Sequence, residues 1–234
     1  MQLTFASYNI HKAVGLDGRR DPERVIAVLR ELHADVIALQ ECDRRLGERE
    51  SVLPRALLDD TPWRAAPVAR RARSLGWHGN ALLVRRDIEI DAAQPLALPT
   101  LEPRGAVAAE LLVDGRRLRV VGMHLDLSGL RRRDQIKAIL QHCERCATAC
   151  PTVLMGDFNQ WGRSTGAVRE FARGWHALAT GNSFPSRRPI APLDRIFHSP
   201  EWTCQRSGVH HSALAAVASD HLPIRATLEL VPEN

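Results

Sequence analysis

Carboxylate, amide and imidazole side chains stand beside several apolar runs of the sequence, each run of the kind that forms a buried strand. These side chains are Asn9, Glu41, His124 with Asp126, Asp157 with Asn159, Asp194, and the pair Asp220 and His221. An ionisable group next to Val, Ile and Leu is costly to bury unless it is paired, hydrogen-bonded or bound to a metal. One such residue would be a satisfied core polar group, but several at strand ends predict a single rim where they converge.

The composition of this rim favours one kind of cofactor. Carboxylate and amide oxygens without a set of thiolates suit a hard divalent cation, above all Mg²⁺, with Mn²⁺ as the substitute. Magnesium usually keeps several waters and binds through one or two carboxylates together with substrate phosphate. His and Asp side chains beside it could activate water and stabilise a transition state at phosphorus. Metal-assisted hydrolysis is therefore one of several reactions that this rim could support.

The elements that must position these residues follow from periodicity and turn residues. We expect strands over 3–9, 35–41, 81–84, 107–113, 117–127, 151–155, 193–198 and 223–230, and helices over 21–32 and 130–149. Asp114 and Gly115 predict a tight turn between the fourth and fifth strands. The last two strands are expected to be joined by a loop rich in small residues and histidine. Strands in both halves without a linker predict one α+β domain over residues 1–234, with two packed sheets and helices outside.

The composition excludes several classes of protein. The chain has 234 residues, of which 44% are hydrophobic, enough for a sizeable core. No apolar run approaches the roughly 18 residues of a transmembrane helix, and the N-terminus lacks the pattern of a signal peptide. Five cysteines are too few for a disulfide scaffold of this length. We therefore expect a cytoplasmic protein with no obligate protein partner.

The charge is basic and dominated by arginine. Lys and Arg number 32 against 27 Asp and Glu, a net charge of +5, and only Lys12 and Lys137 are lysines. The arginine guanidinium suits phosphate oxygens. We attribute the total to biased codon use in a GC-rich genome and expect a function only for individual arginines. A net charge of +5 favours polyanionic partners only weakly.

Seven short motifs occur in order along nearly the whole chain, from residue 3 to about 230. They are Ser7-Tyr8-Asn9-Ile10, Leu39-Gln40-Glu41, His78-Gly79-Asn80-Ala81, His124-Leu125-Asp126-Leu127, Gly156-Asp157-Phe158-Asn159, Leu193-Asp194-Arg195-Ile196 and Ser219-Asp220-His221-Leu222-Pro223. Together they resemble the endonuclease/exonuclease/phosphatase (DNase I-like) superfamily. Each motif alone is a weak signal, but seven in this order are specific.

The resemblance implies a fold and a set of roles. The fold would be a four-layered α/β sandwich, with the site at one end of two packed mixed sheets flanked by helices. The metal ligands would be Glu41, chiefly, with Asn9 and Asp220. The catalytic residues would be Asp157 and Asn159 on the attacking water and a phosphate oxygen, His221 paired with Asp194 at the scissile phosphate, and His124 at a phosphate oxygen. Whether Asp157 or His221 takes the proton stays open.

The branch within the superfamily is indicated by the residues around His124. Abasic-site endonucleases carry a Tyr-containing motif where this chain has His124, which argues against that activity. The His-Leu motif, followed by Arg131 and Gln135, resembles the sphingomyelinase-like and tyrosyl-DNA phosphodiesterase-like branches. The segments around Asn9 and 183–186 most resemble short bacterial members.

Four further residues are candidates for binding the substrate. Asn80 could contact phosphate, or it could be a buried amide that ties two loops together. His11 and Lys12 could meet a phosphate or be solvated loop residues. Arg131 begins a helix next to two further arginines, where an anion-facing patch and a solvated helix face are both consistent with the sequence.

Together with the polar rim, the resemblance implies a Mg²⁺-dependent hydrolase of phosphate esters, above all a phosphodiesterase acting on nucleic acid or a phospholipid head group. One alternative is a phosphomonoesterase of a small phosphorylated metabolite. Another is a non-catalytic polyanion-binding module on the same fold. The presence of every expected catalytic residue counts against that module.

Overall fold

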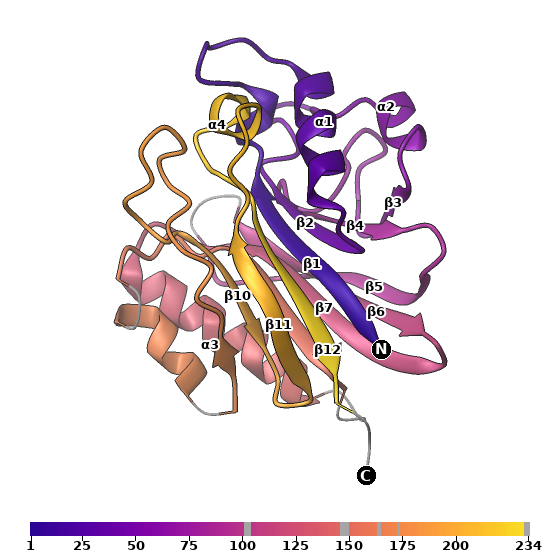
Figure 1. The fold of residues 1–234 in the computed structure, drawn as a ribbon, viewed down its shortest axis with the longest axis vertical. Helices are drawn as coiled ribbons and strands as arrows, with labels where there is room; N and C mark the ends of the chain where they lie inside the picture. The colour runs from indigo at the N-terminus through magenta and orange to yellow at the C-terminus, as the bar shows by residue number, and fades with distance from the viewer. Residues whose placement is uncertain (101–103, 146–149, 163–164, 173, 232–234) are drawn as a thin grey trace.

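Two six-stranded mixed β-sheets form the centre of the molecule (Figure 1). The computed structural model describes residues 1–100, 104–145, 150–162, 165–172 and 174–231. The first sheet has the order β11-β12-β1-β2-β4-β3, with strands Trp202–Val209, Ile224–Leu230, Gln2–Asn9, Val36–Gln40, Ala81–Arg85 and Trp63–Ala65. The second has the order β5-β6-β7-β8-β10-β9, with strands Glu89–Leu96, Gly105–Val113, Arg116–His124, Thr152–Asp157, Asp194–His198 and His176–Ala177.

Each sheet has one parallel strand pair at its middle, and a helix connects the two strands of that pair. The connections are α1 (Pro22–Leu32) between β1 and β2, and α3 (Gly129–Arg145) between β7 and β8. Asp21 caps α1 as predicted, because its carboxylate accepts a hydrogen bond of 3.0 Å from the Arg24 amide. Shorter helical segments are η1 (His11–Ala13), α2 (Arg55–Asp59), η2 (Gly166–Ala172) and α4 (Ala215–Ala218).

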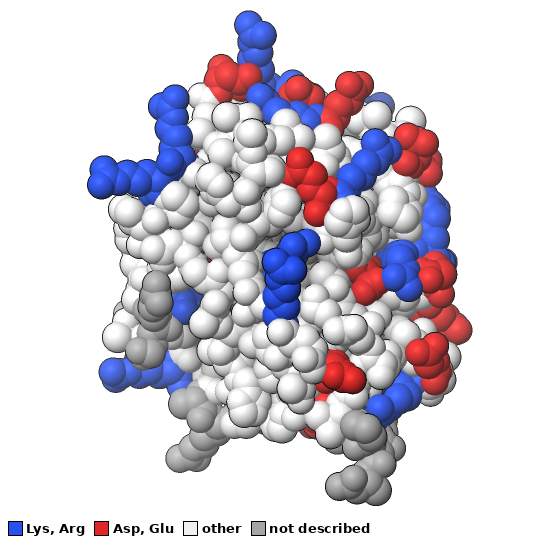
Figure 2. Space-filling view, in the orientation of Figure 1, with Lys and Arg blue, Asp and Glu red and all other residues white. Residues whose placement is uncertain are grey.

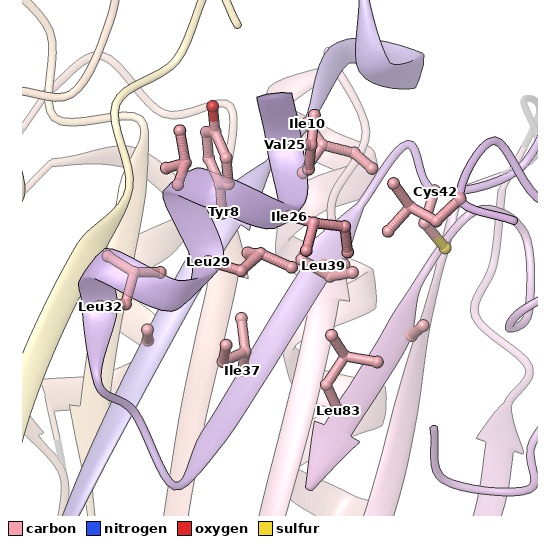
Figure 3. Packing of buried hydrophobic residues seen from close by; sticks show 14 of the residues in the cluster. Tyr8, Ile10, Val25, Ile26, Leu29, Leu32, Ile37, Leu39, Cys42 and Leu83 are labelled. Atoms are coloured by element: carbon pink, nitrogen blue, oxygen red, sulfur yellow. The ribbon is translucent and has the colours of Figure 1, made fainter. Parts of the chain in front are cut away.

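Alternation along the strands divides the buried side chains into three clusters. In β2, Val36 and Ala38 face the second sheet, whereas Ile37 and Leu39 face α1. Figure 3 shows the outer cluster, where Leu39 lies beside Leu29 and Ile37 lies beneath it. On the far side of the molecule Ile136 and Ile139 of α3 pack on the outer face of the second sheet. Helix, sheet, sheet and helix therefore form four layers, as the sequence predicted.

The hairpin predicted at Asp114-Gly115 is present between β6 and β7. Asp114 has a φ of 50° and Gly115 a φ of 75°, the two positive values that a type I′ turn requires. The turn lies at one end of β7 and His124 at the other, where the register of the hairpin places His124 opposite Gly105.

The main difference from the sequence prediction lies between the last two predicted strands. The segment expected to be a loop contains β11, which pairs with β12, and the short α4. β11 is an edge strand whose residues are mostly half-buried or exposed, so it has no apolar run. The predicted strands over 193–198 and 223–230 are close to β10 and β12. The predicted helix over 130–149 ends at Arg145 in the described part of the chain, and residues 146–149 lie outside it.

None of the helices in the described ranges is both long and apolar enough to cross a membrane.

Candidate active site

The predicted site residues meet at one edge of the paired sheets because of strand direction. Asn9, His124 and Asp157 are the last residues of β1, β7 and β8. Asp194 is the first residue of β10, which runs antiparallel to β8 and stands opposite Asp157 in register. His221 precedes β12, which is antiparallel to β1. The ends of some strands and the beginnings of others therefore deliver their polar side chains to one place.

Asp157 is the centre of the cluster. Its side chain is 1% exposed, and its Oδ2 accepts a hydrogen bond of 3.0 Å from Nδ2 of Asn9. The same oxygen lies 3.3 Å from Nε2 of His124 and 3.8 Å from Nε2 of His221. Oδ1 accepts a 2.9 Å bond from the backbone amide of Asn159. Burial raises the pKa of Asp157 to about 6, although the positive charge of His221 opposes the rise.

Asp194 and His221 form a buried pair. Nδ1 of His221 lies 2.8 Å from Oδ2 of Asp194, which also accepts a 2.5 Å bond from the Ser183 hydroxyl. The Phe184 ring packs against the His221 ring, with the two ring centroids 4.8 Å apart. Burial disfavours the charged imidazole, but the carboxylates, Asp194 first, outweigh burial and raise the pKa of His221 to about 10. The ring is therefore an imidazolium at neutral pH.

His124 has the opposite electrostatic environment. Its ring is buried, and the Arg104 guanidinium contacts its Nε2. Burial and the positive charge of Arg104 hold the pKa of His124 well below its usual range, so this ring is neutral at pH 7. The sequence prediction missed Arg104. It stands directly before the strand β6, so the strand-end pattern that marked Asp194 could also have pointed to Arg104.

The expected metal ligands lie around Asn9. Oδ1 of Asn9 accepts a 3.1 Å bond from the His11 amide, and its backbone carbonyl accepts a 2.7 Å bond from the Ser219 hydroxyl. The Asp220 carboxylate lies 3.9 Å from Nδ1 of His11. Lys12 donates to Oε2 of Glu41. Burial raises the pKa of Glu41, but the hydrogen bond and charge of Lys12 outweigh burial and the net shift is downward, so the carboxylate is ionised.

Strained backbone gathers at this edge. Nine residues other than glycine have positive φ in the described part of the chain, and His11, Lys12, Ala13, Glu41, His78 and Asn159 are six of them. Such conformations cost roughly 1 kcal/mol or more each and persist where the surrounding structure imposes them. The contacts of the site therefore hold its loops in conformations that the chain alone would avoid.

The four substrate-binding candidates differ in their surroundings. The side-chain amide of Asn80 donates bonds of 3.3 Å to the carbonyls of Trp77 and His78, so it holds the turn before β4. Arg131 is half-buried in the first turn of α3, and its neighbour Arg132 is the one that contacts the site loops. His11 and Lys12 contact the expected metal ligands, as described above. No result assigns a substrate role to these four residues, which stays a prediction.

One group of three side chains in the described ranges is close enough to hold a metal ion. Asp157, Asp194 and His221 each offer a ligand atom, and these atoms lie within 4.8 Å of one another. The group differs from the ligand set that the sequence predicted, Asn9, Glu41 and Asp220.

The comparisons with known proteins agree with this architecture. A family model described as "Endonuclease/Exonuclease/phosphatase family" matches residues 6–221. No curated protein matches the sequence. Among solved structures, an endonuclease/exonuclease/phosphatase from Bacteroides vulgatus has a TM-score of 0.78 at 18% identity, covering 98% of this chain and 99% of that one.

Two further solved structures resemble the chain over almost their full length. A humanised TDP2 of D. rerio has a TM-score of 0.76 at 16% identity, covering 97% of this chain and 99% of that one. A mannosyl-6-phosphatase of Bacteroides thetaiotaomicron has a TM-score of 0.73 at 20% identity, covering 97% of this chain and all of that one. At these identities the likeness establishes the fold.

Proposed function

The chain belongs to the Endonuclease/Exonuclease/phosphatase family, and from this membership we propose that it is a Mg²⁺-dependent phosphodiesterase. The observation that carries the proposal is one buried carboxylate, Asp157, contacted by Asn9, His124 and His221. These groups can orient a water molecule and donate hydrogen bonds to a phosphate within one small site. The diester substrate is supported by the structural neighbour TDP2, which was also solved with a single-strand DNA product.

Mg²⁺ would bind on the Glu41 side of the site, with Asn9 and Asp220 as further ligands. These side chains offer hard oxygen donors, the kind that Mg²⁺ prefers. The lowered pKa of Glu41 supports this location, because an ionised carboxylate can bind a metal ion; Lys12, which now contacts Oε2, would have to give up that contact to the ion. Glu41 and Asp220 keep side-chain exposures of 22% and 35%, so an ion can reach them from solvent. The bound ion would supply Lewis-acid polarisation of a phosphoryl oxygen.

The group Asp157, Asp194 and His221 fits proton and phosphate chemistry better than magnesium. Nδ1 of His221 is hydrogen-bonded to Asp194, and imidazole nitrogen is a ligand of Zn²⁺, Cu²⁺ or Fe²⁺ more than of Mg²⁺. With Nδ1 engaged, Nε2 is left to donate to an oxygen of the substrate phosphate. Asp194 therefore orients the ring and keeps it charged.

Asp157 is proposed as the group that orients and deprotonates the attacking water. Its carboxylate accepts hydrogen bonds from the Asn9 side chain and from the Asn159 backbone amide, which fix its orientation. A pKa of about 6 suits a base at neutral pH. The side-chain amide of Asn159 donates 2.9 Å to the carbonyl of Leu125, so Asn159 also fixes the loop after His124. His221, already protonated, would then be the electrostatic partner of the phosphate.

A phosphomonoesterase is the second candidate. The mannosyl-6-phosphatase with a TM-score of 0.73 favours it, because that protein is a phosphatase with the same fold. The two candidates share the water-activating site and differ in whether the phosphate carries a second ester group.

The test is hydrolysis of two simple substrates, bis-p-nitrophenyl phosphate as the diester and p-nitrophenyl phosphate as the monoester. With Mg²⁺ or Mn²⁺ the wild-type protein should release p-nitrophenol faster from the diester, and EDTA should abolish the reaction. Replacing Glu41→Gln or Asp157→Ala should lower turnover by at least about a thousandfold, since each removes a group acting at the transition state.

Glu229→Gln is the matched control for Glu41→Gln. Glu229 is exposed in β12, opposite Gln2 at the end of β1 remote from Asn9, so this variant should keep wild-type turnover. Near-wild-type activity of Glu41→Gln in Mg²⁺ would overturn the hydrolase proposal. Faster hydrolysis of the monoester would favour the second candidate.

A further inference from the structure

A pocket adjoins the active site on the side of Glu41 and His124. Both residues line it, together with four arginines, Arg44, Arg45, Arg49 and Arg104. Three of the arginines come from the segment after β2, and Arg104 precedes β6, so the pocket joins loops of both sheets. We call it the basic pocket.

The negative charges of the basic pocket have partners of their own. Glu41 is paired with Lys12. Asp43 also lines the pocket, but it is 5% exposed and its carboxylate accepts bonds of 2.5 Å from the Ser74 hydroxyl and 2.8 Å from the Leu75 amide. Asp43 therefore supports the backbone of its own loop. The arginines outnumber the two carboxylates, so the pocket keeps an excess of positive charge.

Arg104 and Arg49 are held by contacts inside the basic pocket, whereas Arg44 and Arg45 are exposed at its mouth. Arg104 is 9% exposed and contacts Nε2 of His124. The Arg49 guanidinium lies 3.3 Å from Nδ1 of His78, a ring whose pKa burial and nearby arginines lower. Arg44 lies 3.9 Å from a carboxylate oxygen of Glu50. Four guanidinium groups around one pocket repel one another, and a bound anionic ligand would offset that repulsion.

The net charge of +5 is spread over 234 residues, so it does not by itself place four arginines around a single pocket. On the face shown in Figure 2, for comparison, acidic and basic side chains lie next to one another at the top and right of the molecule. Arginine forks match the oxygens of phosphate in a bidentate manner, which favours a phosphate ligand over a simple halide.

We propose that the basic pocket binds a second phosphate group of the substrate, next to the phosphate that is hydrolysed. The inference rests on the proposed function, because it uses His124 and Glu41 as the boundary between the two phosphates. The second phosphate belongs either to a neighbouring nucleotide of a strand or to a small bisphosphorylated molecule. A zwitterionic choline head group would place a cation near the arginines and is disfavoured.

The kinetic test compares dithymidylates that differ by one terminal phosphate, TpT, pTpT and TpTp. The wild-type protein should have a kcat/KM at least tenfold higher for one of the phosphorylated forms than for TpT. In Arg45→Gln and Arg49→Gln that ratio should approach one. Arg133→Gln, an exposed arginine of α3 paired with Glu170 at 3.2 Å, is the matched control and should keep the wild-type ratio.

A binding measurement separates this proposal from the proposed function. In EDTA, inorganic pyrophosphate should bind the wild-type protein by calorimetry, and Arg49→Gln should weaken that binding at least tenfold. Loss of binding in the variant supports the pocket even if the protein hydrolyses nothing. Equal binding by wild type and variant, with equal kcat/KM for TpT and its phosphorylated forms, would overturn it.

A third arm identifies the source of the second phosphate. Release of inorganic phosphate from fructose 1,6-bisphosphate is compared with release from fructose 6-phosphate in wild type and Arg49→Gln. An arginine-dependent preference for the bisphosphate supports a small molecule, and such a preference confined to the dithymidylates supports a nucleic acid strand. Both outcomes support the proposal that the basic pocket binds a second phosphate. The absence of an arginine-dependent preference in both series would contradict it.

Discussion

The two histidines of the site have opposite charge states because their nearest charged neighbours differ. His221 is bonded to Asp194 and faces Asp157, whereas His124 is contacted by Arg104. Both rings are buried, and burial alone would keep both neutral. The carboxylates thus give the site one permanent imidazolium, and Arg104 adds a second fixed cation beside a neutral ring. This division of roles suits a dianionic transition state.

Replacing Asp194→Asn should shift the pH profile of the reaction. The folded pKa of His221, about 10, lies above the ordinary value of 6.5, so the ring stays protonated up to about pH 10 in the wild type. Without the Asp194 charge, burial dominates and the pKa falls, so activity should decline as pH rises through a lower range. We expect kcat/KM at pH 8 to fall by about a hundredfold, with a smaller loss at pH 6. A parallel loss at both pH values would contradict this role of Asp194.

The same pair should make stability depend on pH. A folded pKa above the unfolded value means that the folded chain binds the proton more tightly. The contribution of the protonated His221 to the free energy of unfolding is therefore full below about pH 6.5 and is lost as the pH rises toward 10. Urea unfolding should show a fall in stability on the order of 3 kcal/mol between pH 7 and pH 10. The fall should be much smaller in Asp194→Asn; an equal fall in both proteins would assign it to other groups.

Much of the cluster was predictable from residue type and position in the sequence. Asn9, Asp157, Asp194, His124 and His221 stand at strand ends and do meet in space. Their chemical roles remain predictions. Arg104 and the other arginines of the basic pocket were not identified from the sequence. The chain has 30 arginines, so residue type alone does not single out these four, and only folding brings residues 44–49 beside Arg104.

At the scale of elements, the first turn of α3 connects two loops of the site. The sequence prediction pointed to Arg131, but Arg132 is the buried residue. Arg132 donates bonds of 3.0 and 2.7 Å to the carbonyls of Asp126 and Leu127, and one of 3.1 Å to the side chain of Gln160. It therefore ties the loop after His124 to the loop after Asp157.

Replacing Arg132→Lys should impair catalysis through position rather than binding. Lysine keeps the charge but cannot reach three acceptors on two loops at once. We expect kcat to fall about tenfold at unchanged KM, measured at a temperature at which circular dichroism shows both proteins folded. The control, Arg133→Lys, changes an exposed neighbour. A wild-type kcat in Arg132→Lys would show that catalysis does not depend on the Arg132 hydrogen bonds between the two loops.

The β6–β7 hairpin offers a purely conformational test. Gly115 has a φ of 75°, and a Cβ added there would have nothing within 4 Å, so Gly115→Ala meets no neighbour and only backbone strain. We expect a loss of about 1 kcal/mol in the free energy of unfolding, with activity unchanged. Gly208→Ala in β11 is the control, since that site is equally open and has no positive φ. Equal stability of the two variants would contradict the strain argument.

The elements that the sequence predicted correctly are those with apolar runs or strong turn residues. β1, β2, β8 and the hairpin belong to this class. β11 and β5 were missed, because both lie at sheet edges and have mostly exposed or half-buried residues. Edge strands gain their order from a partner strand, and the local sequence does not carry that information.

At the scale of the whole molecule, the site depends on how the two sheets pack. Asn9, Glu41 and His221 come from loops and ends of the first sheet, whereas His124 and Asp157 come from the second. The hydrogen bond from Asn9 to Asp157 therefore crosses between the sheets. Any change in sheet spacing should alter this bond before it alters either half of the site.

The spacing is set in part by Gly122 of β7. A Cβ at this position would lie 3.0 Å from Cβ of Ala38 in β2 and 3.1 Å from Cδ2 of Leu82 in β4. Gly122→Ala should overpack the interface and lower the free energy of unfolding by about 1 to 3 kcal/mol. Gly122→Ala should also reduce kcat, because the added methyl group pushes the two sheets apart and so separates Asn9 from Asp157.

A double-mutant cycle with Ala38→Gly shows whether the added methyl group acts by pushing the two sheets apart or by a local effect on β7. Ala38→Gly alone should cost up to about 1 kcal/mol. In the double variant the methyl group moves from one sheet to the other, so the two changes should be coupled by at least about 1 kcal/mol, and part of the lost kcat should return. Urea unfolding and turnover of all four proteins measure this coupling. Simple additivity in both quantities would mean that the two sheets adjust independently and that their contact at Gly122 does not set the geometry of the site.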